Sequence, residues 1–162
     1  MTIRRTTALV VLLAGVSAVV LLSVASAGSQ ATKQRISFLQ VFDPTTESGS
    51  WKLVPLSPGP LKADSGGQKG GGKVGAQTLR NGQRVLPIVG SDKMTGKRGT
   101  LVISQSLVST GVGRRYTADI GTWKVVSGTG AYEGMTGGGR FAGVGLPGGK
   151  VIINQEGWVT VG

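Results

Sequence analysis

The stretch from Gly137 to Gly145 constrains the fold of this chain more than any other. Glycine occupies positions 137, 139, 143 and 145, and only Phe141 interrupts this every-second-residue pattern. Because alternate residues of a β-strand face the same side, this strand has one face that is bare except for one aromatic ring. Such a strand can bend sharply, as the corner of a small barrel requires, and Phe141 can cover the bare backbone. The alternative is that the missing side chains leave a cavity for a ligand.

The candidate binding residues lie on this strand and just before it. Arg140 is on the face opposite Phe141, and Tyr132 precedes the strand. If a ligand approaches the bare backbone, Tyr132 would stack on it and Arg140 would contact an anionic group. For a catalyst, the local polar candidates are Asp119, Tyr132, Glu133 and Arg140. Surface charge is the alternative interpretation of Asp119 and Glu133.

The pattern of residues 36–162 is typical of an all-β domain. No segment after residue 27 has helical periodicity of useful length, and glycine, threonine, serine and valine dominate. Adjacent strands joined by short turns favour an antiparallel sheet that is closed, or nearly closed, into a barrel. Pro87 indicates an edge or a bulge. The predicted strands span residues 36–42, 51–54, 85–89, 100–110, 116–120, 122–127 and 150–161.

Two segments lack the apolar residues of a strand. Residues 28–35 are small and polar and are predicted to be a flexible lead-in. Residues 59–73 contain six glycines and are predicted to be a mobile loop. Gly67 and Gly72-Lys73 match part of a phosphate-binding loop, but Val74 replaces the required Ser or Thr and no apolar strand leads in.

The N-terminus predicts export. Arg4 and Arg5 precede an uncharged apolar run over residues 8–24, and Ala25-Ser26-Ala27 provides the small residues that a signal peptidase accepts. We therefore predict a signal peptide over residues 1–27, cleaved between Ala27 and Gly28, and a secreted or cell-envelope product without a membrane span. An uncleaved anchor is the alternative, because the run is at the lower edge of bilayer-spanning length.

The absence of two residue types excludes much site chemistry. The chain has no cysteine and no histidine. Disulfides, thiolate zinc sites, cysteine nucleophiles and the Ser-His-Asp triad are therefore excluded. Gly128, Gly130 and Gly134 miss the dinucleotide fingerprint because the third glycine comes one residue late and no helix is expected to follow. We expect no cofactor and no metal.

The positive charge favours anionic partners. After cleavage the chain would keep 16 of its 18 Lys and Arg residues against 7 acidic residues, a net charge of +9. Outside the membrane, such a surface attracts anionic cell-envelope polymers. The charges are spread rather than clustered, which favours a solubilising surface and no specific nucleic-acid site.

The segment GTWKVVSGTGAYEGMTGGG, from Gly121 to Gly139, resembles the signature of the allene oxide cyclase and dirigent barrel superfamily. The resemblance covers about residues 99–162 and implies an eight-stranded antiparallel barrel with an apolar lumen. In plant relatives, that lumen cyclises a fatty-acid epoxide or steers phenoxy-radical coupling. No catalytic residue carries over, because the matching positions are structural glycines and a strand aromatic.

Three functions follow from these observations. The first is a secreted barrel that binds a small apolar or aromatic ligand without catalysis. The second is a basic protein held to anionic envelope polymers. The third is a dirigent- or cyclase-like catalyst that works by positioning. The ligand and the oligomeric state are not specified by the sequence.

Overall fold

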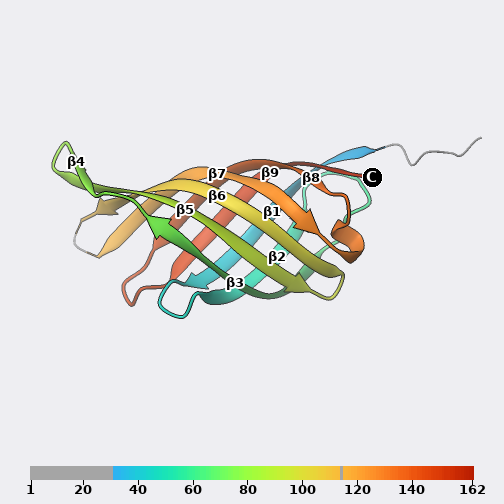
Figure 1. Ribbon diagram of the computed structural model, residues 1–162, viewed down its shortest axis with the longest axis horizontal. Coiled ribbons are helices and arrows are strands. Elements are labelled where there is room, and N and C mark those ends of the chain that lie inside the picture. The colour runs from blue at the N-terminus through green and yellow to red at the C-terminus, as the bar shows by residue number, and fades with distance from the viewer. Residues whose placement is uncertain (1–30, 114) are drawn as a thin grey trace, which may run out of the picture.

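The protein folds into an antiparallel β-barrel, seen from the side in Figure 1. The computed structural model describes residues 31–113 and 115–162, so the predicted signal peptide and the Ala27–Gly28 cleavage site lie outside the described residues. No helix in the described part has the length and hydropathy needed to cross a membrane. The described strands are β1 (Thr32–Asp43), β2 (Ser48–Pro55), β3 (Asp64–Val74), β4 (Thr78–Arg80), β5 (Gln83–Gly96), β6 (Gly99–Val112), β7 (Tyr116–Gly128), β8 (Thr136–Gly145) and β9 (Val151–Val161).

Eight of these strands close into a ring. Their order is β3-β2-β1-β9-β8-β7-β6-β5, and β5 pairs with β3 to complete the barrel. The remaining strand, β4, pairs only with β5 and extends beyond the barrel as a hairpin (Figure 1). Asn81 and Gly82 form its turn with φ angles of 51° and 75°, which suit a two-residue turn with both central residues left-handed. The predicted eight-stranded antiparallel barrel is confirmed.

The first ordered strand begins earlier than predicted. Residues 32–35 are not a flexible lead-in but the start of β1, where Thr32 pairs with Val161 and Gln34 with Val159 on β9. The Gln34 side chain is buried, and its amide accepts from the N–H of Leu61 and donates to the carbonyl of Ser57. A polar sequence can be ordered here because the C-terminal strand supplies backbone partners.

The predicted mobile loop over residues 59–73 is largely wrong. Residues 64–74 form β3, which pairs with β2 on one side and with β5 on the other. Its glycines allow close approach of neighbouring strands: a Cβ on Gly66 would collide with the carbonyl oxygen of Thr95. β3 is therefore held by backbone hydrogen bonds to both neighbours rather than by apolar side chains of its own.

Two predicted strands, residues 116–120 and 122–127, are one continuous strand, β7. Gly121 does not break it, because this residue pairs with Leu107 on β6 and Phe141 on β8. A register shift in the pairing of β6 with β7 lies at Val102/Ile103. The short piece predicted over residues 85–89 is likewise part of the longer β5.

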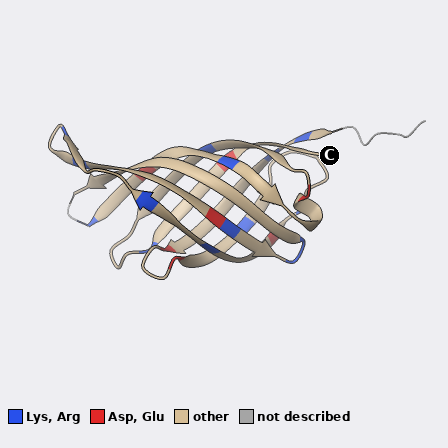
Figure 2. Ribbon diagram, in the orientation of Figure 1, with Lys and Arg blue, Asp and Glu red and all other residues tan. Residues whose placement is uncertain are grey.

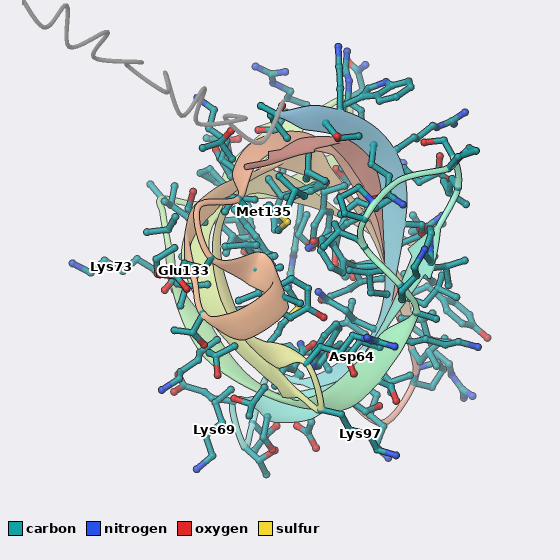
Figure 3. The ribbon with its side chains drawn as sticks, turned by 90° about the vertical axis from the view of Figure 1, so that its right-hand side faces the viewer. Asp64, Lys69, Lys73, Lys97, Glu133 and Met135 are labelled. Carbon is teal, nitrogen blue, oxygen red and sulfur yellow. The ribbon has the colours of Figure 1, made fainter. Side chains whose placement is uncertain are left out.

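A short 3-10 helix, η1 (Gly130–Tyr132), closes one end of the barrel. Figure 3 looks onto this end and shows the turn lying across the opening, with Met135 beside it. The Tyr132 and Met135 side chains are buried in the main hydrophobic core. The opposite end, next to the β4 hairpin, has no such turn among the described residues.

Candidate functional site

The lumen is divided into a packed half and a hollow half. The packed half lies toward η1 and contains the larger cluster of buried apolar side chains. Phe38 contacts Trp51 and Trp123 edge to face, with ring centroids 6.2 and 5.3 Å apart, and Trp51 contacts Tyr132 at 6.3 Å. Rings that interlock in this way pack the barrel interior at this end.

A buried carboxylate fixes the closing turn to the barrel wall. The Tyr132 hydroxyl donates to Oδ2 of Asp64 at 2.8 Å, and the backbone N–H groups of Ser65, Lys97 and Arg98 donate to the same carboxylate. Burial alone would raise the pKa of Asp64, but these four hydrogen bonds outweigh it and lower that pKa. Burial and, to a smaller extent, the hydrogen bond to Asp64 raise the pKa of Tyr132, so its hydroxyl stays protonated as the donor.

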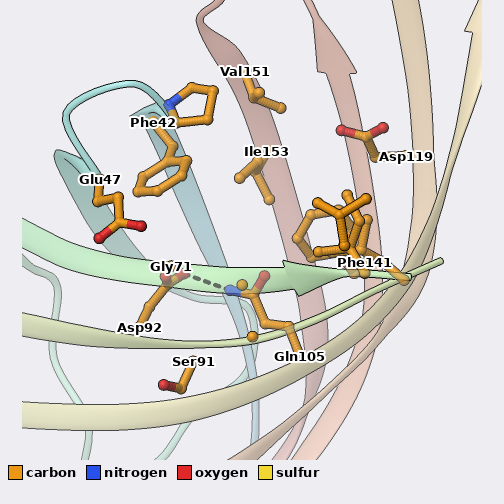
Figure 4. Close-up of a pocket in the computed structure, with 16 residues that line it drawn as sticks. Phe42, Glu47, Gly71, Ser91, Asp92, Gln105, Asp119, Phe141, Val151 and Ile153 are labelled. Carbon is orange, nitrogen blue, oxygen red and sulfur yellow. Dashed lines mark hydrogen bonds between the residues drawn. The ribbon is translucent and has the colours of Figure 1, made fainter. Parts of the chain in front are cut away.

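The hollow half contains a cavity of about 250 Å³. It is small against ordinary ligand sites of roughly 300–1,000 Å³, so it suits a small molecule. A second, smaller cluster of buried side chains, formed by Leu107, Phe141 and Ile153, lies at its wall. The apolar lining is Phe42, Pro44, Val74, Ile88, Leu107, Phe141, Val151 and Ile153, and the polar side chains are Glu47, Ser91, Asp92, Gln105 and Asp119 (Figure 4).

The glycine-faced strand β8 contributes differently to the two halves. A Cβ on Gly137 or Gly139 would collide with the backbone of β9, so their bare face is used for close strand packing. Farther along, the Phe141 ring lies against Gly143, with its Cε1 atom 3.3 Å from where a Cβ would be. Phe141 therefore covers part of the bare backbone and also forms a wall of the cavity.

Asp92 and Gln105 form a polar pair on the cavity wall. The Gln105 amide donates to Oδ2 of Asp92, and both side chains come from neighbouring strands, β5 and β6. Burial disfavours the charged carboxylate and raises the pKa of Asp92 to about 6, although the Gln105 hydrogen bond acts in the opposite direction. Asp92 can therefore change its charge in mildly acidic solution.

Asp119 presents a carboxylate to the cavity from β7. Its side chain is 7% exposed, and its buried Oδ1 atom has no hydrogen-bond partner among the described residues. Figure 4 shows Asp119 and Asp92 on different sides of the cavity. Asp119 also borders a wider outer vestibule of about 1,000 Å³, whose wall includes Arg84, Arg115 and Tyr116.

Three buried glutamines separate the packed half from the cavity. Gln155 lies between Phe38 of the packed core and Phe141 of the cavity wall in the strand register. Gln40 similarly lies between Trp51 and Ile153, and Gln68 pairs with Met94. Within the described chain, the two amide atoms of Gln68 and of Gln155 and the Oε1 atom of Gln40 have no hydrogen-bond partner. This glutamine layer therefore holds unused polar groups next to the cavity.

The structure does not bring the predicted binding residues together. Tyr132 is completely buried at the closed end, where it hydrogen-bonds to Asp64. Arg140 is exposed and pairs with Thr122 and Glu156 on neighbouring strands. Glu133 is exposed beside η1 (Figure 3), whereas Asp119 is buried rather than on the surface.

The sequence contained a signal for the residues that line the cavity. Asp119 has the same strand parity as Gly121 and Trp123, and Trp123 is buried. Asp92 lies on the same face of its strand as the buried Met94. The strand predicted over residues 85–89 ends before Asp92 and Met94, so it did not include them. Extending both strands would have placed these acids in the lumen.

The cavity combines apolar walls with a few hydrogen-bonding groups on a rigid scaffold. This arrangement is typical of small-molecule sites. No group of three or more Asp or Glu residues in the described chain gathers closely enough to hold a metal ion. A scan against protein-family models and searches of the curated proteins and of the solved structures returned no match for this chain.

Proposed function

We propose that this protein is an exported barrel that binds a small, largely apolar or aromatic molecule in its hollow half without transforming it. The observation that carries the proposal is the unequal filling of the lumen. One half is packed with interlocking aromatic rings, while the other keeps a cavity that is lined mainly by apolar side chains and opens toward the vestibule. A barrel optimised only for stability would fill both halves.

The resemblance of residues 121–139 to the allene oxide cyclase and dirigent signature supports the same proposal. The resemblance implies an eight-stranded barrel with an apolar lumen, and the chain has that barrel. We propose membership of that superfamily on the segment and the fold together. Catalysis is the weaker alternative, because of the four polar candidates for it only Asp119 lines the cavity.

Matched substitutions on β9 test ligand binding. Val151 lines the cavity, whereas its neighbour Ile152 points outward and is 51% exposed. Val151→Phe should fill the cavity and weaken binding of the neutral fluorescent probe N-phenyl-1-naphthylamine by about tenfold, which corresponds to about 1.4 kcal/mol. Ile152→Phe should leave the affinity of the probe unchanged.

Two measurements accompany the fluorescence titration. Thermal unfolding of both variants shows that the barrel remains folded, and native mass spectrometry of protein purified from its own host shows any retained ligand. Equal affinities of the two variants for the probe, or no binding by the parent protein together with no co-purified ligand, would overturn the proposed function.

A second proposal concerns the outer surface. Lysine and arginine residues are distributed over the strands and loops of the barrel (Figure 2), and one ion pair, Arg35 with Glu156, is formed within the described residues. The other lysine and arginine side chains that the structure describes have no carboxylate at ion-pair distance among the described residues. We propose that this surface holds the exported protein to anionic polymers of the cell envelope.

A further inference from the structure

The cavity differs in charge from the rest of the molecule. The full chain has 18 basic and 7 acidic residues, yet three of the seven acids, Glu47, Asp92 and Asp119, line this one cavity. No lysine or arginine is among the described residues that line it. The proposed ligand cavity is therefore negatively charged in a protein whose net charge is positive.

Asp119 provides the strongest indication of what the cavity recognises. Its side chain is more than nine-tenths buried, and its Oδ1 atom is without a hydrogen-bond donor in the described structure. A buried carboxylate oxygen without a donor is costly, so a ligand that brings a donor gains the hydrogen bond and relieves that cost. A positively charged donor gains most, because charge-assisted hydrogen bonds are about twice as strong as neutral ones.

The other acids favour the same sign of charge. Asp92 uses its Oδ2 atom to accept from Gln105 and contributes a second negative charge from the β5 wall. Glu47 lies at the rim, in the turn between β1 and β2 (Figure 4). A cation in the cavity is attracted by all three carboxylates, whereas an anion would be repelled by them.

The apolar walls of the cavity indicate what kind of molecule carries the positive charge. Since the acids do not form a metal-binding group and most of the lining is apolar, a bare ion would leave the walls unused. Phe42 and Phe141 line the cavity, and aromatic rings can contact both an apolar body and an ammonium group. An organic cation with a compact hydrocarbon or aromatic body satisfies both parts of the cavity.

We propose that the cavity binds a primary amine carried on a small apolar or aromatic body, with its ammonium group at Asp119. The body lies against Phe141, Leu107 and Ile153. This inference rests on the proposed function, because it names the class of ligand for the same cavity. The arginines of the vestibule, Arg84 and Arg115, do not line the inner cavity.

The test uses three probes with the same ring system and different head groups: 2-naphthylmethylamine, 2-naphthylmethanol and 2-naphthoic acid. Isothermal titration calorimetry of the full chain near pH 7.5 should show the amine binding at least about tenfold more tightly than the alcohol, and the acid more weakly than either. Asp119→Asn should reduce the affinity for the amine to that for the alcohol and leave the alcohol unchanged. Asp92→Asn should weaken amine binding to a smaller extent.

The control is Glu133→Gln, which removes an exposed acid at the closed end of the barrel. It should leave the affinities for all three probes unchanged, and circular dichroism checks that every variant is folded. Equal or tighter binding of the alcohol or the acid would overturn the amine inference while leaving the proposed function standing. So would an amine preference that survives in both aspartate variants. Failure of all three probes to bind would overturn the proposed function as well.

Discussion

Asp92 shows how one side chain can lower stability in favour of a site. Its carboxylate is 7% exposed, and burial raises its pKa to about 6 from an ordinary value of 3.8. The neighbouring strands offer no compensating charge, because Asp92 pairs with Gly70 on β3 and with Ile103 on β6, and its hydrogen-bond donor on β6 is the neutral Gln105. The other charged groups that face the cavity, Glu47 and Asp119, are also acids.

The pH dependence of folding follows from this raised pKa. The unfolded chain ionises Asp92 more readily than the native state, so native stability decreases as pH rises from about 4 to about 6 and stays lowered above that range. Asp92→Asn should therefore increase the free energy of unfolding near pH 7.5 by on the order of 2 kcal/mol and have little effect near pH 4. Urea unfolding at the two pH values measures this difference.

Glu133→Gln is the control for the Asp92 variant, because this exposed acid is not buried in the lumen. It should change the free energy of unfolding by less than about 0.5 kcal/mol at either pH. An Asp92→Asn effect of the same size at both pH values would show that burial of the charge is not the cause.

At the scale of elements, β3, which closes the barrel by pairing with β5, has the weakest hydrophobic pattern. The alternation of apolar residues correctly predicted strands at β6 and β9, because their inward positions carry Leu101, Ile103, Ile153 and Val159. Five of the six inward positions of β3 are glycine or polar residues (Asp64, Gly66, Gln68, Gly70 and Gly72), so hydrophobic periodicity could not detect this strand. Its order comes from long-range pairing with β2 and β5, which no local pattern contains.

The same distinction explains the candidate site. The sequence predicts Tyr132 and Arg140 as binding residues because Tyr132 precedes the glycine-faced strand and Arg140 lies on it. However, η1 directs Tyr132 into the closed end and strand parity places Arg140 outside. The barrel class could be predicted from the sequence. The cavity residues could not, because they come from several strands that become neighbours only when the barrel closes. Asp92 and Asp119 are 27 residues apart in sequence and come together only through the lumen.

Adjacent glycines of β3 provide a direct test of close strand packing. A Cβ on Gly66 would collide with the Thr95 carbonyl oxygen, whereas the nearest atom to a Cβ on Gly67 is the Gly49 carbonyl oxygen at 3.9 Å. Gly66→Ala should lower the free energy of unfolding by about 1–3 kcal/mol, because the β3–β5 pairing must shift. Gly67→Ala should change it by less than about 0.5 kcal/mol. Chemical denaturation of the two variants compares them, and equal losses would contradict the role assigned to Gly66.

For the whole molecule, the charges are separated between inside and outside. Lysine and arginine exceed acidic residues in the chain, whereas the charged residues among those that line the cavity are all acids. Figure 2 shows the basic residues distributed over the strands and loops of the barrel. The two proposed partners, an anionic polymer and a small amine, therefore use different surfaces and should respond differently to salt. Exposed charges are screened by added salt, whereas a buried contact is screened much less.

Salt titration separates the two binding modes. Binding to immobilised polyglutamate should fall by at least about tenfold between roughly 50 and 300 mM NaCl, while the affinity for 2-naphthylmethylamine should change by less than about threefold. Asp119→Asn should abolish the amine preference and leave polymer binding unchanged, since this side chain is buried in the lumen. Polymer retention that is insensitive to salt would contradict a surface-charge mechanism. Loss of polymer binding in the Asp119 variant would show that the two partners share one site.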